Sequence, residues 1–282
     1  MPILSFFLFV LLSQSTIEPL TISNDGEELA TIIREDYILF EEDLFIDDNK
    51  LNKLVNKIEH MVYKKPENAI IDEDGKIIEE KIGYTLNKTD LNEQISKYFY
   101  KGSPTNINVS KLPVYPKVDS ELLSEIHDVK IGEYTTYYKV NNEERSHNIA
   151  LATKAINNYV LFPGEQFSFN KIVGKRTKER GYKRAPVIVK GEFAEDIGGG
   201  ICQVSSTLFN AVNISGINII ERVTHSRNVP YVPKGKDATV SWWGPDFIFA
   251  NKYDHPILIQ ARAKNGIMNV QVFTSNNAKY NQ

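Results

Sequence analysis

The chain is poor in the features that most quickly identify a protein class. It has one cysteine, Cys202, among 282 residues, so no disulfide can form within it. In an exported protein, a lone cysteine indicates either pairing between molecules or a free reactive thiol. We also find no internal repeat, no low-complexity tract, no metal-ligand spacing, no Walker loop and no dinucleotide fingerprint. We therefore expect no cofactor and no bound metal.

Long hydrophobic runs are missing as well. The run Ile3 to Leu12 is apolar, but it is about ten residues long, whereas a membrane-spanning helix needs about twenty. Residues 1–17 therefore resemble a signal peptide or a membrane anchor, and we expect the protein outside the cytoplasm, in the cell wall or on the outer face of the membrane. No Lys or Arg precedes Arg34, although such segments normally begin with positive charge.

Neither sign of charge is in large excess, because 33 basic and 36 acidic side chains give a formal net charge of only -3. This balance does not indicate a nucleic-acid partner. The charges are unevenly placed: residues 18–60 contain twelve acidic and four basic side chains, while residues 171–190 contain eight basic and one acidic. The basic stretch can steer an anionic substrate, or it can simply be a solvated face. Nothing in the sequence indicates an oligomeric state.

Residues 18–122 are expected to form a small α+β module. Apolar residues recur at helical spacing over Asn49 to Tyr63, with Asp47 and Asp48 before them as capping residues. Asp74-Gly75 predicts a hairpin turn, and Asp90 with Glu93 predicts the start of a second helix that runs through Phe99. Residues 111–117 contain two prolines and read as an extended linker.

Residues 128–282 are expected to form a second α+β domain, in which a mostly antiparallel sheet packs on one helix that bears a nucleophile. A helix is predicted over Cys202 to Ile214, followed by Gly216 as its cap. Asn265-Gly266 is a strong hairpin signal. The strands are predicted at 134–140, 166–169, 186–189, 217–222, 239–242, 247–250, 257–263 and 267–273.

Cys202 lies where a glycine loop, Gly198 to Gly200, is expected to break into a helix. A thiol attacks as the thiolate, and the free N–H groups and positive dipole end of a helix N-terminus stabilise negative charge. The glycines let a substrate carbonyl approach the backbone closely, so the amides of Cys202 and Gln203 are candidate oxyanion donors. The opposing interpretation is that Cys202 is a small, packed core residue.

A thiol nucleophile needs a base, and histidine suits this role. Of the five histidines, His225 is the best candidate, because a strand that returns beside the cysteine helix would end near it. His147 before a helix and His255 before Pro256 are interpreted as structural. For the carboxylate that orients the imidazole, Asp246 is preferred to Asp237. Either aspartate can instead cap a turn.

Two further groups can contact a substrate. Trp242 and Trp243 beside a Gly-Pro turn can form the wall of a groove, or they can belong to the core. Arginine is well suited to bind a carboxylate in a bidentate manner. The basic candidates for this, each of which can also be an ordinary surface residue, are Arg176, Arg180, Lys183, Arg184 and Arg227.

Several separate motifs resemble the VanW family in order and spacing. They are Pro163 to Asn170, Gly198 to Thr207, Glu221 to Asn228, Asp237 to Val240, Gly244 to Phe247 and Asn251. The resemblance extends from about Tyr134 to Phe273. Less specifically, the region from about Asp48 to Leu122 is similar to the peptidoglycan-binding module that often precedes such domains.

The resemblance implies work on the bacterial cell wall, with peptidoglycan stem peptides as partners and a cysteine L,D-transpeptidase activity. Carried onto this chain, it makes Cys202 the nucleophile and His225 its histidine. Together with the assignments above, the expected catalytic residues are Cys202, His225 and Asp246, and the expected substrate-binding residues are Gly200, Gln203, Ser205, Ser206, Arg227, Trp242 and Trp243. The alternatives are a cysteine carboxypeptidase or amidase that trims stems, and a non-catalytic wall-binding scaffold.

Overall fold

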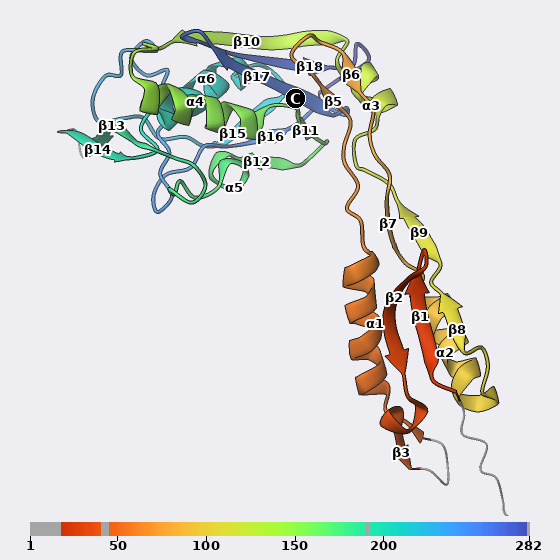
Figure 1. Ribbon diagram of the computed structural model, residues 1–282. Coiled ribbons are helices and arrows are strands. Elements are labelled where there is room, and N and C mark those ends of the chain that lie inside the picture. Colours follow the sequence, from red (N-terminus) through yellow and green to blue (C-terminus); the bar gives the residue numbers. More distant parts are fainter. Residues whose placement is uncertain (1–17, 41–44, 190–191, 281–282) are drawn as a thin grey trace, which may run out of the picture. The chain divides into compact units, whose positions relative to one another are not determined.

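The computed structural model describes residues 18–40, 45–189 and 192–280, which form two compact units (Figure 1). Unit 1 consists of Met1–Glu67 and Lys81–Lys117, and unit 2 of Asn68–Glu80 and Val118–Gln282. The predicted signal or anchor segment, 1–17, lies outside the described residues. Within the described ranges, no helix has the length and apolar character needed to cross a bilayer.

Unit 1 packs two helices against a small sheet. Strands β2 (Glu27–Ile32), β1 (Leu20–Asn24) and β8 (Asn106–Asn108) are paired in that order, and β3 (Ile38–Phe40) pairs with β4 (Phe45–Ile46) after a short 3-10 helix, η1 (Arg34–Tyr37). Helices α1 (Asp48–Val62) and α2 (Lys88–Lys101) bury one face each in a core that includes Ile58, Tyr98 and Phe99. Unit 1 is therefore an α+β module with a core of its own.

Both helices predicted in unit 1 are confirmed, but the N-cap of the second helix, α2, is a different residue from the predicted one. Asp47 caps α1 by accepting a hydrogen bond from the Lys50 amide, as an N-cap aspartate should. Helix α2 begins three residues earlier than predicted, because Asn87 instead of Asp90 is its cap and accepts from the Asp90 amide. The Asp90 side chain instead accepts hydrogen bonds from Gln94 and Ser110.

Two sequence-based interpretations of this region differ from the structure. The predicted linker 111–117 contains strand β9 (Lys111–Val114), which pairs with β7 (Gly83–Leu86) of unit 1. Pro113 is tolerated there because β9 has no second partner strand. The predicted hairpin, β5 (Ile70–Ile71) and β6 (Ile77–Ile78), forms as expected but belongs to unit 2.

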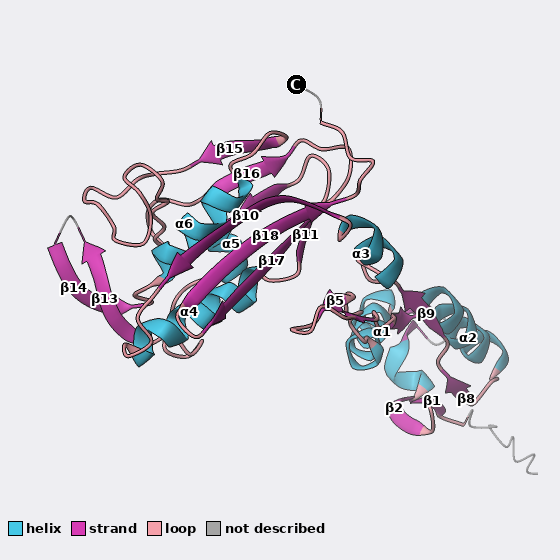
Figure 2. Cartoon of the chain, turned by 90° about the horizontal axis from the view of Figure 1, so that it is seen from above, coloured by secondary structure: helices cyan, strands magenta, loops and turns pink. Residues whose placement is uncertain are grey.

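Unit 2 is α+β and layered, as Figures 1 and 2 show. Its main sheet is antiparallel and has the order β10 (Val129–Tyr137), β18 (Ile267–Thr274), β17 (Ile257–Lys264) and β11 (Tyr159–Leu161). Helices α4 (Glu143–Ile156) and α6 (Ile201–Val212) lie under this sheet, and a second sheet, β12 (Gln166–Ser168), β16 (Ile248–Asn251) and β15 (Ile217–Glu221), lies beyond them. One buried cluster, which includes Leu208, Phe249 and Val270, joins the three layers.

Local signals explain much of unit 2. Asn265 and Gly266, with φ of 53° and 81°, make the turn between β17 and β18 that the sequence predicts. Helix α6 is almost entirely buried, which leaves it no solvent face. Two short helices complete the unit: α3 (Ser120–Ile126) packs with the β5–β6 hairpin, and α5 (Phe169–Val173) follows β12.

A projecting hairpin leads into the site. Among the described strands, β13 (Arg184–Val189) and β14 (Glu192–Ile197) pair only with each other, and β14 runs directly into the glycine loop before α6. The sequence predicts β13 but not β14. The predicted strand 239–242 is reduced to one bridge, Val223 to Thr239.

Candidate functional site

The glycine loop fixes how the chain enters helix α6. Gly198 and Gly200 have φ of +90° and +105°, a region that L-residues with a Cβ rarely adopt. A Cβ at Gly198 would lie 3.1 Å from the Arg176 stem, and one at Gly200 would lie 2.9 Å from Cγ of Arg145. The loop is therefore glycine-rich because two arginine side chains pack closely against it.

Cys202 stands in the first turn of α6 and is partly exposed. Its Sγ lies 3.6 Å from the carbonyl oxygen of Val240. His225 is the titratable neighbour whose pKa Cys202 raises. The Gln203 amide donates to the Gly200 carbonyl at 3.0 Å, so it is not the free oxyanion donor that we expected. Within the described ranges, the Cys202 amide donates to no other backbone group, so it is the donor that can face a substrate carbonyl.

His225 is held by Asp237. Oδ2 of Asp237 lies 2.6 Å from both the backbone nitrogen and Nδ1 of His225. A carboxylate only accepts, so Nδ1 carries the proton and Nε2 is the ring nitrogen left for Cys202. Both side chains are largely buried, with exposed fractions of 7% and 8%. Imidazole and carboxylate thus form a buried, directly bonded pair.

This arrangement raises the pKa of His225. Burial alone would lower that pKa, but the hydrogen bonds and negative charge supplied by Cys202 and Asp237 outweigh it. The protonated imidazole is therefore favoured to a higher pH than in a free histidine.

Polar side chains on α6 fix the segment that carries Asp237. Ser206 Oγ accepts from the Ala238 amide at 2.9 Å, and Ser205 Oγ donates to the Ala238 carbonyl at 2.6 Å. From the other side, Arg222 Nε donates to the Asp237 carbonyl at 2.8 Å. Arg222 thereby has a structural role in the run from Glu221 to His225.

Asp246 is not beside the imidazole, so our preference for it as the third residue is not supported by its position. Its carboxylate accepts from Ser168 Oγ at 2.5 Å and from the amides of Asn170 and Phe247 at 2.8 and 2.7 Å. It caps the start of α5, where the chain passes between β12 and the short helix. Asp237, the second choice in the sequence analysis, is the aspartate whose carboxylate contacts the His225 imidazole.

The residues expected to bind substrate fall into three groups. Gln203, Ser205 and Ser206 are buried to 1% exposure or less, and their side chains bond within the protein. Gly200 shapes the loop. Trp242, Trp243 and Arg227 are exposed, and Trp243 is 86% exposed. The tryptophans follow Val240 by two and three residues. They therefore belong to the same segment as the Val240 carbonyl, which contacts the Cys202 thiol.

Sequence reasoning missed two groups beside Cys202. Arg145 donates from Nη2 to Gln203 Oε1 at 2.8 Å, and burial lowers the pKa of its guanidinium. Burial, and after it the neighbouring Cys202, raises the pKa of Tyr231. Arg145 lies 57 positions before Cys202 in α4, and no local pattern links it to the thiol.

The remaining histidines lie apart from this chain of contacts. His147 is within α4 instead of before it, and its Nε2 lies 2.8 Å from the Gly181 carbonyl oxygen. His255 pairs with Asp254 at 2.7 Å. His60 is in α1 of unit 1, and His127 stacks on Phe273.

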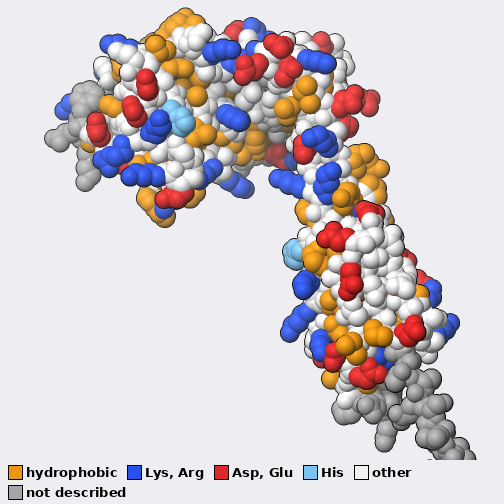
Figure 3. Space-filling view, viewed as in Figure 1, with side chains coloured by type: hydrophobic (Ala, Val, Ile, Leu, Met, Phe, Trp, Pro, Cys, Tyr) orange, Lys and Arg blue, Asp and Glu red, His pale blue; other side chains and the backbone are white. Residues whose placement is uncertain are grey.

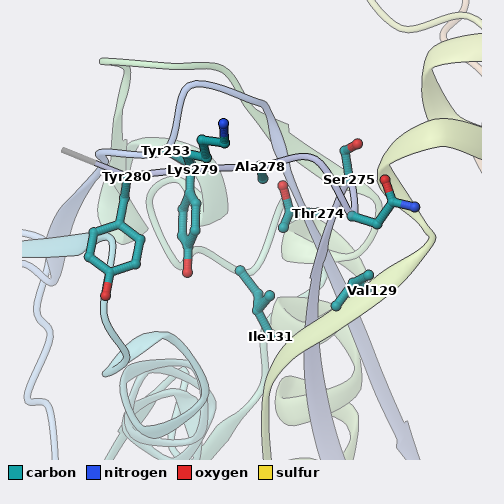
Figure 4. Close-up of a pocket in the computed structure, with 9 residues that line it drawn as sticks. Val129, Ile131, Tyr253, Thr274, Ser275, Ala278, Lys279 and Tyr280 are labelled. Carbon is teal, nitrogen blue, oxygen red and sulfur yellow. The ribbon is translucent and has the colours of Figure 1, made fainter.

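Further features of the described residues are the placement of metal-ligating side chains, a hollow and the distribution of surface charge. In the described part of the chain, no three His, Cys, Asp or Glu side chains are placed to hold a metal. The hollow in Figure 4 is lined by residues of β10, by Tyr253 and by the C-terminal segment, and Cys202 is not among its lining residues. On the face drawn in Figure 3, basic and acidic side chains are interspersed.

Comparisons with known proteins agree on one family. A family model described as "VanW like protein" matches residues 144–273. The uncharacterized protein YoaR of Bacillus subtilis (strain 168) is 48% identical over 259 residues, which cover 92% of this chain and 86% of that protein. The vancomycin B-type resistance protein VanW of Enterococcus faecalis (strain ATCC 700802 / V583) is 32% identical over 125 residues, or 43% of this chain and 46% of that protein. No solved structure matches.

Proposed function

Because the chain belongs to the VanW family, we propose that it is a cysteine L,D-transpeptidase that cross-links the third residues of peptidoglycan stem peptides. The observation that carries the proposal is the 2.6 Å contact between Nδ1 of His225 and Asp237, which leaves Nε2 for Cys202, the residue that raises the pKa of this imidazole. A thiol, an imidazole and a carboxylate in this order are the parts of a nucleophilic acyl-transfer site.

In the first half of the reaction, the Cys202 thiolate bonds to the carbonyl carbon of the third stem residue. The peptide C–N bond breaks, and protonated His225 gives its Nε2 proton to the leaving amine of the terminal D-alanine. A thioester remains on Cys202. The Cys202 amide is placed to donate to the oxyanion of the tetrahedral intermediate, a type of contact whose loss slows such chemistry by about a hundredfold or more.

In the second half, a side-chain amine of a neighbouring stem attacks the thioester carbonyl. Neutral His225 takes a proton from that amine, the new C–N bond replaces the C–S bond, and the thiol is restored. Asp237 holds the Nδ1 proton throughout, so Nε2 always faces the sulfur. Atoms and charges balance without a cofactor.

Two further roles belong to this proposal. We infer that the protein works outside the cytoplasm, where stem peptides are found, and that unit 1 binds peptidoglycan. The scaffold alternative needs Cys202 to be an inert packed residue, whereas its thiol is partly exposed and meets an imidazole. That contact favours the enzyme.

The products of the reaction test the proposal and its nearest alternative together. Purified disaccharide tetrapeptide is incubated with the protein and with Cys202→Ala, and the products are identified by mass spectrometry. We expect cross-linked dimers from the unaltered protein and none from Cys202→Ala, with both proteins folded. Trimmed monomers alone would indicate a hydrolase, because water would then have resolved the thioester. Dimers from Cys202→Ala would remove Cys202 from its role.

A further inference from the structure

Two arginines border the nucleophile without a carboxylate partner. The stem of Arg176 packs on Gly198 and that of Arg145 on Gly200, so the two side chains meet the loop on either side of Gly199, just before Cys202. Neither guanidinium forms an ion pair with a described carboxylate. Burial lowers the pKa of both guanidinium groups.

The hydrogen bonds of the Arg176 guanidinium are incomplete, and those of Arg145 include no charged partner among the described residues. Nη1 of Arg176 donates to Asn170 Oδ1 at 2.6 Å, but its Nη2 is buried and has no partner. Arg145 Nη2 donates to the neutral amide of Gln203. Asp246, the carboxylate that most affects Arg176, accepts from Ser168, Asn170 and Phe247 instead.

Burying a charged donor without a partner is costly. Proteins tolerate that cost mainly where a ligand supplies the missing group. Guanidinium groups match carboxylates in shape and charge. An incoming carboxylate beside Cys202 is therefore the partner that this arrangement lacks.

We propose that Arg176 and Arg145 bind the free α-carboxylate of the residue that leaves when Cys202 attacks, so that the protein selects acyl donors ending one residue beyond the cleaved bond. In such a donor the carboxylate carbon is two bonds from the leaving nitrogen. Because that nitrogen is bonded to the carbonyl carbon that Cys202 attacks, the carboxylate must lie close to the thiol. This inference rests on the proposed function and names its donor class. It predicts that a tetrapeptide is used and that its C-terminal carboxamide is not.

Binding measured without chemistry tests the inference. In the Cys202→Ala background, calorimetry compares a stem tetrapeptide that ends in free D-alanine with the same peptide ending in D-alaninamide. We expect the free acid to bind roughly tenfold to a hundredfold more tightly. Arg176→Gln and Arg145→Gln should each reduce this preference, and Arg176→Lys should keep part of it because the charge remains.

Lys178→Gln is the matched control, because it removes one positive charge from the same exposed segment and should leave the preference unchanged. Equal binding of the two peptides to Cys202→Ala, or failure of both to bind, overturns the inference. This comparison uses Cys202→Ala alone, so it does not depend on the folding of any arginine variant. A preference that survives both arginine substitutions also overturns it.

The failures of this inference and of the proposed function are distinguishable. If the protein with Cys202 forms a thioester from acid and amide donors alike, the transpeptidase proposal stands and the carboxylate site fails. If the acid is preferred in binding but no thioester forms, the carboxylate site stands and the reaction fails. If arginine variants slow both donors equally, the arginines act on the thiolate and not on the substrate, which contradicts the inference.

Discussion

At the scale of single residues, the assignment of the third catalytic residue depends on one contact. In the sequence, Asp237 and Asp246 are both candidates for the carboxylate that orients the imidazole, because each lies near the end of a predicted strand. Only Asp237 reaches the imidazole, at 2.6 Å, because Ser205, Ser206 and Arg222 hold its segment against α6. Sequence spacing cannot rank the two, since the choice depends on which loop folds back onto the helix.

This contact predicts a change in pH dependence. Asp237→Asn should reduce transpeptidation on the order of a hundredfold or more, because the imidazole loses the carboxylate that orients it. The carboxylate helps to raise the pKa of His225, so the substitution lowers that pKa. Protonated His225 is needed for the leaving amine, and the alkaline limb of the kcat/KM profile should therefore move to lower pH.

The control for this experiment is Asp246→Asn. It should leave the alkaline limb in place and instead lower the free energy of unfolding by about 1–3 kcal/mol, because the bonds to Ser168 and two amides weaken. A limb that moves in Asp246→Asn but not in Asp237→Asn would reverse the assignment.

At the scale of elements, strongly periodic segments were predicted well from the sequence. Helix α1 and the β17–β18 hairpin form where apolar spacing and Asn-Gly predict them. Helix α6 forms after the glycine loop as predicted, but it ends at Val212 with Asn213, and not Gly216, as its C-cap. Strands β9 and β14 were missed because each pairs with one partner at an edge, so neither needs a continuous apolar pattern. The β5–β6 hairpin was predicted, but its packing partner was not.

That hairpin offers a test with two adjacent residues. Ile71 is 3% exposed in a cluster with Leu123, Ile126 and Leu258 of unit 2, and its backbone bonds to Asn158, whereas Ile70 is 43% exposed. Ile71→Ala should destabilise unit 2 by about 2–5 kcal/mol, and Ile70→Ala by about 0.5 kcal/mol or less. Both tryptophans lie in unit 2, so tryptophan fluorescence during urea unfolding reports this unit. Equal shifts for the two variants would place the hairpin elsewhere.

At the scale of the whole molecule, the candidate site is assembled from parts that are distant in sequence. Arg145 comes from α4, Arg176 from the loop after α5, Cys202 from α6, and His225 and Asp237 from the segments after β15. The Cys–His pair could be predicted because glycines and a helix start mark the thiol, and the resemblance marks the histidine. The arginines could not, since only packing in three dimensions brings them to the glycine loop.

The interleaved units are a second feature that sequence could not provide. The chain leaves unit 1 after Glu67, contributes residues 68–80 to unit 2, and returns to unit 1 at Lys81. A division of the chain at residue 122 would separate the hairpin from the core it covers. Domain boundaries predicted from composition assume that each unit is one continuous segment of the chain. Here each unit consists of two segments.

Intact-protein mass spectrometry after brief incubation with a stem tetrapeptide tests the central claim most directly. We predict an added mass equal to the donor minus its terminal D-alanine, located on Cys202, released by hydroxylamine, and absent from Cys202→Ala. His225→Gln should accumulate the adduct far more slowly. A protein that cross-links stems without ever carrying such a mass, or that carries it on another residue, would contradict the account.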